Sequence, residues 1–149
     1  MKVVFSLTFL GILLFMSACG CVEVPSTPDP PTTVRGWQEF DEQGIHAIGE
    51  FLLRKHQSIE NDKFGVELVE TITPKRCSDP WAEDDVTPRV VMRFYEVPGK
   101  RVILETKIRK QANLRLIDVD FPSARYGVGA ISVRDINTRD EWVWFELWK

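Results

Sequence analysis

The residues best suited to acid–base chemistry are His46 and His56, the two histidines of the chain. Their numbers differ by ten, so on a helix they would lie about 80° apart around the axis and ~15 Å apart along it. At that separation the two rings cannot bind one metal ion, and the HExxH pattern of zinc proteases is absent. Acid–base catalysis would require one of them beside a carboxylate in a pocket, which Glu42 or Glu50 would allow. We expect two ordinary helix residues and no metal site.

Motifs for nucleophilic catalysis or phosphate binding are incomplete. The GxSxG pattern is absent, and Cys77 has no adjacent histidine. Residues 126–129 (YGVG) are glycine-rich, but no helix is predicted after them that could direct N–H groups at a phosphate, so they predict a strand bend or bulge. We therefore predict no enzyme activity and no cofactor. The alternative is an enzyme of the cone-shaped α+β type, such as an isomerase, which would need more helices over the sheet and a polar group inside it.

The cysteines offer one covalent cross-link. Three occur in the chain. If export removes the residues before Cys21, then Cys21 and Cys77 remain, and an oxidising compartment would favour a disulfide bond between them. The alternative is that Cys21 lies on a flexible tail and never meets Cys77. We therefore carry Cys21–Cys77 as a candidate disulfide.

The last segment of the chain, 142–148, is rich in tryptophan. Its tryptophans alternate with valine, phenylalanine and leucine, so both faces of a strand here would be apolar. Such a strand is normally covered on both sides, which makes core burial the simpler interpretation. The alternative is that one face contacts a partner, because tryptophan is a frequent interface anchor. The tryptophans concerned are Trp142, Trp144 and Trp148.

One helix is predicted to support these residues, over 41–57. Asp41 is a suitable N-cap, and an apolar stripe follows at helical spacing. Gly44 and Gly49 lower the intrinsic helix stability, so packing against a sheet must hold the helix in place. The apolar stripe consists of Ile45, Ile48 and Leu52.

The rest of the domain is predicted to form strands. Pro98-Gly99 has the chemistry of a type II turn, so the segments on either side should form a hairpin. The longest irregular stretch is 74–88. One helix followed by five or six antiparallel strands predicts an α+β fold, in which a single curved sheet wraps over the helix. The predicted strands are 64–73, 89–97, 101–109, 114–121, 126–134 and 142–148.

The first residues have the pattern of a signal peptide. Lys2 is followed by an apolar run and then by small residues. The apolar run is shorter than the ~20 residues that a membrane-spanning helix needs. The next residues contain four prolines between 22 and 34, which predicts an extended, disordered tether. The predicted organisation is therefore a signal peptide (1–20), a tether (21–34) and a folded domain (35–149).

The cleavage site allows two locations for the mature protein. Ala18-Cys19-Gly20 suits ordinary signal peptidase with cleavage before Cys21, which would release a secreted protein. Met16-Ser17-Ala18-Cys19 resembles a bacterial lipoprotein box, in which a lipid on Cys19 would tether the protein to a membrane. The net charge of -3 and the absence of a Lys/Arg run exclude a typical nucleic-acid partner.

Three segments resemble the cystatin family, particularly the plant-type cystatins. Residues 34–38 (VRGWQ) are similar to the glycine that ends the flexible trunk of these proteins and to the stretch that follows it. Residues 48–57 (IGEFLLRKHQ) resemble their single helix, and residues 66–71 (VELVET) resemble the strand after it. The match covers residues 34–73. It implies a cystatin-like fold, with one helix on a curved antiparallel sheet.

The resemblance also implies a tight-binding inhibitor of papain-like cysteine proteases. In that family the trunk glycine and two hairpin loops form a wedge that blocks the active-site cleft. Gly36 carries over as the protease-binding residue, with Trp37 as its neighbour. The chain departs from the family at the first hairpin loop, where 74–88 replaces Gln-x-Val-x-Gly, and at the second, because Pro80-Trp81 lies in the wrong loop.

Two functions remain from the sequence. The first is a secreted cystatin-like protein that inhibits papain-like cysteine proteases weakly or in a degenerate way. The alternative is a non-inhibitory extracellular module that binds another protein or a peptide through its sheet or through the 74–88 loop. Neither function requires a metal ion or a cofactor.

The predicted removal of the signal peptide can be tested directly. Signal peptidase should leave a mature N-terminus at Cys21 or close to it, and the intact mass of the exported protein measures this. A mass increase that matches acylation of Cys19 would instead support the membrane-tethered alternative. A product that retains Met1 would contradict both forms of export.

Overall fold

The structure is a computed structural model that describes residues 21–25, 27–38, 47–77 and 86–149. The predicted signal peptide, 1–20, lies outside these residues. So do His46, the N-terminal part of the predicted helix and Pro80-Trp81.

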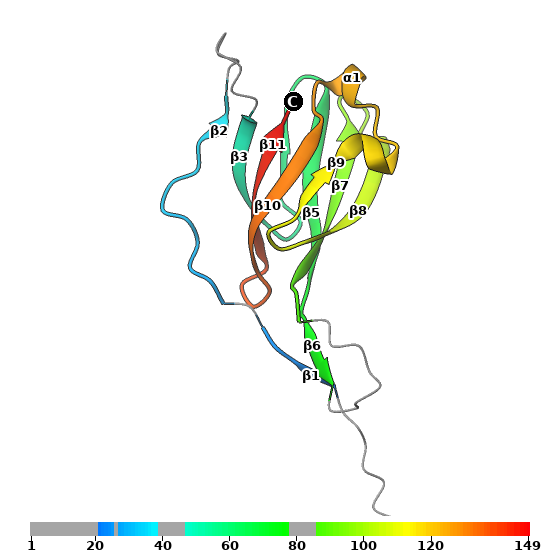
Figure 1. The fold of residues 1–149 in the computed structure, drawn as a ribbon. Coiled ribbons are helices and arrows are strands. Elements are labelled where there is room, and N and C mark those ends of the chain that lie inside the picture. The colour runs from blue at the N-terminus through cyan, green and yellow to red at the C-terminus, as the bar shows by residue number, and fades with distance from the viewer. Residues whose placement is uncertain (1–20, 26, 39–46, 78–85) are drawn as a thin grey trace, which may run out of the picture.

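The described chain is mostly antiparallel β-structure, with one short α-helix (Figure 1). The prediction of a mostly antiparallel β domain is confirmed, but the strands form three sheets and not one. The five-stranded sheet has the order β2 (Gly36–Trp37), β3 (Ala47–Arg54), β11 (Trp142–Trp148), β10 (Ala130–Asn137) and β9 (Asn113–Arg115). The four-stranded sheet has the order β4 (Ser58–Glu60), β5 (Phe64–Ile72), β7 (Arg89–Glu96) and β8 (Val102–Arg109). The third is a ribbon of β1 (Cys21–Glu23) and β6 (Lys75–Cys77).

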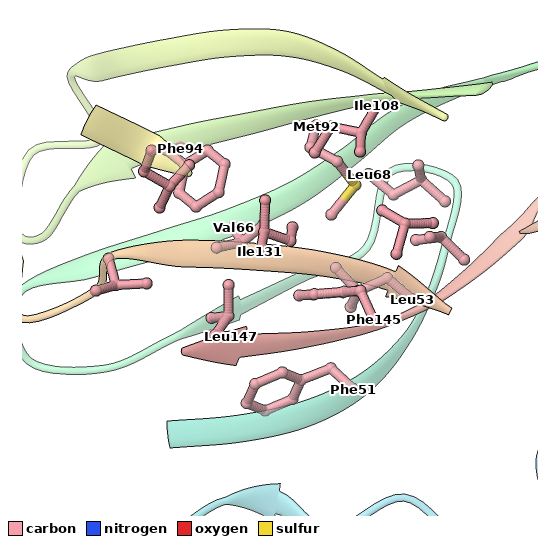
Figure 2. Packing of buried hydrophobic residues seen from close by; sticks show 14 of the residues in the cluster. Phe51, Leu53, Val66, Leu68, Met92, Phe94, Ile108, Ile131, Phe145 and Leu147 are labelled. Atoms are coloured by element: carbon pink, nitrogen blue, oxygen red, sulfur yellow. The ribbon is translucent and has the colours of Figure 1, made fainter. Parts of the chain in front are cut away.

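The two larger sheets pack face to face around one hydrophobic core. Alternate residues of each strand point inward, so a period of two decides which side chains are buried. Figure 2 shows side chains of the five-stranded sheet meeting those of the four-stranded sheet. The fully buried residues include Val143, Phe145 and Leu147 of β11 and Phe64, Val66 and Leu68 of β5.

The prediction of a helix over 41–57 is wrong for 47–57, the part of it that the structure describes. Residues 47–54 form β3, which pairs with β11 on one side and β2 on the other. A turn follows β3, and β4 begins at Ser58. The described part of the predicted helix, 47–57, therefore provides no helix on which the predicted single curved sheet could wrap.

Pairing with distant strands makes this segment a strand, although its sequence pattern also fits a helix. The run is apolar enough to fit either period, and short apolar runs do not distinguish helix from strand. As a strand it buries Phe51 and Leu53 and turns Leu52 outward. The Phe51 ring lies over Gly49, where an added Cβ would come within 2.3 Å of a ring carbon. The glycine that weakens a helix thus makes room for an aromatic ring on the strand.

The other strand predictions differ in outcome. The strand at 64–73 and the hairpin of 89–97 with 101–109 are confirmed as β5, β7 and β8. The hairpin turn is longer than a type II turn, because the N–H of Lys100 donates to the carbonyl of Glu96 at 2.9 Å. It contains a cis peptide bond at Val97–Pro98.

The strands predicted at 114–121 and 126–134 are each only partly correct. β9 stops at Arg115 and a 3₁₀ turn follows (η1, Leu116–Val119); before β10 the chain forms a single helical turn (α1, Ser123–Tyr126). Phe121, between these two elements, and Tyr126 of α1 are buried, and their ring centroids lie 5.5 Å apart. Phe121 also contacts the ring of Phe94 at 5.2 Å. The aromatic rings close one end of the sandwich, which straight strands would leave open.

Residues 21–34, predicted as a disordered tether, lie along the domain in the structure. We call 21–25 and 27–38 the strap; Figure 1 shows it running from β1 to β2 along one side of the molecule. The N–H of Val24 donates to the carbonyl of Pro74 at 2.8 Å. The side-chain amide of Asn137 donates to the carbonyl of Pro28 at 3.1 Å. Local proline content predicts an extended chain, but hydrogen bonds to distant residues fix its course.

Neighbouring leucines test the strand assignment of β3. Leu53 is 2% exposed and faces the core, so Leu53→Ala should lower the free energy of unfolding by roughly 2–5 kcal/mol. Leu52 is half-buried on the outer face, so Leu52→Ala should lower the free energy of unfolding by less than half as much. Urea denaturation of both variants measures the difference. A larger loss at Leu52 would favour the helical register, which turns Leu52 inward.

Candidate functional site

The predicted wedge residues form part of the sandwich edge. Gly36 and Trp37 make up β2 and pair with Glu50 and Gly49 of β3. The Trp37 ring lies 4.7 Å from the ring of Phe51, and it also contacts Phe64 of the other sheet at 5.9 Å. Trp37 is 38% exposed. The structure thus uses Trp37 to close the gap between the sheets beside β3.

The two cysteines of the candidate disulfide, Cys21 and Cys77, lie on the β1–β6 ribbon. Cys21 is disulfide-bonded. The ribbon register places Cys77 directly opposite Cys21, and Cys77 is the other cysteine of the described residues. The pairing of Cys21 with Cys77 stays a prediction that this register favours. A disulfide at Cys21 holds the start of the strap.

The histidine that the structure describes has a backbone role. His56 lies in the turn between β3 and β4 with a φ of 63°. Its N–H donates to the carbonyl of Leu68 at 2.7 Å. His56 is exposed, and this turn replaces the helix on which we expected it.

The tryptophans of β11 have different environments. Trp142 is buried, with 1% exposure. Trp144 and Trp148 are half-buried on the outer face of the five-stranded sheet. The indole N–H of Trp144 donates to the Glu50 carboxylate at 2.9 Å, whereas the buried indole nitrogen of Trp148 has no hydrogen-bond partner among the described residues. The hydrogen bond to Glu50 fixes the orientation of the Trp144 ring.

A hollow of about 470 Å³ opens beside Trp144 on this outer face. We call it the Trp144 hollow. It lies where β9, β10 and β11 meet the chain that leaves β8, so its residues come from three separate parts of the sequence. Its polar lining consists of Gln111, Asn113, Ser132, Arg134 and Asp135.

Some polar groups of the hollow are paired with each other. Ser132 donates to the side-chain oxygen of Asn113, and Lys110 forms an ion pair with Asp135 at 2.8 Å. Arg134 forms an ion pair with Glu146 through one terminal nitrogen.

Other polar groups of the hollow are available to a ligand. Three sets of donors form no hydrogen bond with another described residue: the Gln111 amide, the Asn113 amide nitrogen and the remaining N–H groups of Arg134. The hollow therefore presents hydrogen-bond donors beside a tryptophan ring. Such an arrangement can bind carbonyl, carboxylate or hydroxyl oxygens of a ligand.

Glu50 connects the hollow to the strap. Its carboxylate, with the whole residue only 9% exposed, accepts from Trp144 and lies 3.6 Å from the Arg35 guanidinium. A largely buried carboxylate needs such partners, because an unpaired buried charge is strongly destabilising. The strap thus helps to hold Trp144 in position.

The outer face of the four-stranded sheet also has a hollow, of about 350 Å³, but its charged groups are paired. Tyr95 lies across Gly65 and donates to the Glu60 carboxylate at 2.6 Å, and Lys100 lies 3.1 Å from the same carboxylate. The hydrogen bond from Tyr95, with a further one from Lys100, lowers the pKa of Glu60. Burial raises the pKa of Tyr95, and the hydrogen bond to Glu60 raises it further.

Arg93 completes the pairing on this face. Its guanidinium bridges Glu67 at 3.1 Å and Glu105 at 2.9 Å, across three adjacent strands. Cross-strand pairs of opposite charge stabilise a sheet. The polar groups of this face serve its own strands, which leaves the Trp144 hollow as the stronger candidate site.

A third polar cluster holds α1 against the β7–β8 hairpin. The Glu96 carboxylate accepts from the Tyr126 hydroxyl at 3.1 Å and from Arg125 at 2.6 Å, and it pairs with Arg101 at 3.0 Å. The hydrogen bond from Tyr126 is the main cause of the lowered pKa of Glu96. The folded state therefore favours the ionised carboxylate. Its contribution to stability is present above the ordinary glutamate pKa and is lost as the pH falls through the lowered value.

No family model matches this chain, and no curated protein or solved structure matches it significantly. Within the described ranges, no helix has the length and hydropathy needed to cross a membrane. The same ranges contain no group of three or more His, Cys, Asp or Glu residues placed to bind a metal ion.

Papain titration checks the wedge hypothesis for Gly36. Trp37 is engaged in the core edge and two of the three family contact elements are absent from the sequence, so inhibition should be micromolar or weaker, about -8 kcal/mol or less favourable. Any inhibition that remains should fall further in Gly36→Glu.

Gly127→Glu is a matched control for that variant. Gly127 has a φ of 71°, close to the 69° of Gly36, and a Cβ at either position has no atom within 4 Å. Both variants therefore carry the same backbone strain. Nanomolar inhibition that Gly36→Glu abolishes and Gly127→Glu preserves would contradict the expected weak binding and establish the wedge.

Proposed function

We propose that this chain is an exported, non-inhibitory module that binds a peptide segment of another extracellular protein in the Trp144 hollow. The observation that carries the proposal is the group of unpaired donors beside the oriented Trp144 ring. The charged groups that line the hollow of the four-stranded sheet pair with each other.

The position of Trp144 suits a binding anchor. Its Nε1 is already bonded to Glu50, so the ring is held before a ligand arrives. Tryptophan is among the residues that contribute most to binding at protein interfaces. A side chain that is already ordered loses less conformational entropy on binding, which favours affinity.

The lining of the hollow favours an uncharged ligand with oxygen acceptors. Arg134 is paired with Glu146 and Lys110 with Asp135, so the charged groups near the hollow largely neutralise one another. The free donors of Gln111 and Asn113 are neutral amides. Backbone carbonyls of a peptide provide suitable acceptors, and an apolar side chain of the peptide could lie against the Trp144 ring.

Protease inhibition is the weaker hypothesis. Trp37 contacts Phe51 and Phe64, so a wedge that inserts Trp37 into a cleft would have to break these contacts. Gly36 is held in the β2–β3 pairing.

Export is part of the proposal. The signal pattern of residues 1–20 and the disulfide of Cys21 both favour an oxidising compartment. We propose Cys77 as the partner of Cys21 because it is opposite in the ribbon. Release after cleavage before Cys21 and tethering through a lipid on Cys19 remain the two alternatives.

Substitution of Trp144 tests this function. An NMR titration of the ¹⁵N-labelled mature protein with a library of short blocked peptides should shift the signals of the Trp144 indole, Gln111 and Asn113. Trp144→Ala should weaken the binding of a selected peptide tenfold or more, which is about 1.4 kcal/mol. Val102→Ala, which shortens an exposed apolar side chain beside the hollow of the four-stranded sheet, is the control and should leave the affinity unchanged.

Two outcomes would contradict the proposal. One is peptide binding that Trp144→Ala preserves while the circular dichroism spectrum shows a folded protein. The other is binding that Val102→Ala abolishes, because that result would move the site to the four-stranded sheet.

A further inference from the structure

Among the described strands, one edge of the two large sheets is long and open. The edge strands β2, β4 and β9 have only two or three residues each. β8 has eight residues and, of the described strands, pairs only with β7. A long edge strand presents unpaired N–H and C=O groups on which another strand can add.

The hydrogen-bond pattern shows which residues of β8 direct their backbone N–H and C=O groups away from β7. Lys110 donates its N–H to the carbonyl of Pro88 at 2.9 Å, just beyond the Arg89–Arg109 pair. Bonded and non-bonded pairs alternate in an antiparallel ladder. The backbone groups of Thr106 therefore face β7, and those of Glu105 and Lys107 face away from it.

The side chains on this edge are complementary to a second copy of themselves. If two β8 strands pair antiparallel about a two-fold axis at Thr106, Glu105 of each copy lies opposite Lys107 of the other. Both side chains are exposed, and Lys107 forms no ion pair with another described residue. On the core side, Leu104 of one copy then lies opposite Ile108 of the other.

The same charges select one register. Sliding the two strands by two residues places either Glu105 opposite Glu105 or Lys107 opposite Lys107, and like charges directly opposite are destabilising. Arg93 holds the Glu105 carboxylate at 2.9 Å in the single chain, so one half of each new ion pair is already positioned.

We propose that β8 is a homodimer edge, on which two copies of this chain pair antiparallel about Thr106. Residues Glu105 and Lys107 then form two hydrogen-bonded backbone pairs related by the two-fold axis, each with an ion pair on the outer face. The pairing joins the two four-stranded sheets into one continuous sheet. It is independent of the proposed peptide binding, since the Trp144 hollow lies on the other sheet.

Sedimentation of the mature exported protein over a range of concentrations tests the dimer. The average mass of the wild type should rise from one chain towards two as the concentration increases. Lys107→Glu should keep the mass at one chain, because it places Glu105 opposite a second glutamate. Lys63→Glu makes the same charge change at an exposed residue of the β4–β5 turn and should leave the dimer intact.

A charge exchange makes the test specific. The double variant Glu105→Lys with Lys107→Glu restores opposite charges across the axis and should recover the dimer, with circular dichroism showing that both variants are folded. A wild type that stays at one chain at every concentration would overturn the proposal. So would a dimer that persists in Lys107→Glu, because its interface would lie elsewhere.

Discussion

The structure depends on the burial of the inward face of β11 against β5. β11 is the middle strand of its sheet, and its Val143, Phe145 and Leu147 are fully buried. A strand in this position must be paired on both edges, because unpaired backbone groups beside a core would lose their hydrogen bonds. β10 supplies one edge and β3 the other, so residues 47–54 adopt the strand conformation despite a pattern that also fits a helix.

The strap depends on this sheet and in turn supports the candidate site. β2 pairs with β3, and Trp37 then reaches both sheets through Phe51 and Phe64. The same stretch brings Arg35 towards Glu50, which orients Trp144 from the other side. A proline-rich segment with little core of its own therefore helps to orient the Trp144 ring, which lines the hollow.

The two outer faces of the sandwich differ in how their polar groups are satisfied. On the four-stranded sheet, Arg93 bridges two glutamates and Glu60 accepts from Tyr95, so the charges neutralise each other across the strands. Beside the five-stranded sheet, the side-chain amide of Gln111 forms no hydrogen bond with another described residue. A ligand that binds to a paired group must break a hydrogen bond within the protein, whereas a solvent-exposed donor exchanges a water molecule for an acceptor of the ligand. This difference supports the choice of the Trp144 hollow.

The sequence by itself determined the features that local chemistry controls. The β-branched and apolar residues of 64–73 and the Pro98-Gly99 turn were enough to predict β5 and the β7–β8 hairpin. Tertiary structure decided the rest. The apolar residues of 47–54 fit both the helical and the strand period, and pairing with β11 selects the strand. The site brings together Gln111, Ser132 and Trp144, which lie far apart in the sequence, so the sequence does not show that they are neighbours. Local patterns report which side chains prefer burial, but the pairing of distant strands fixes which neighbours each face receives.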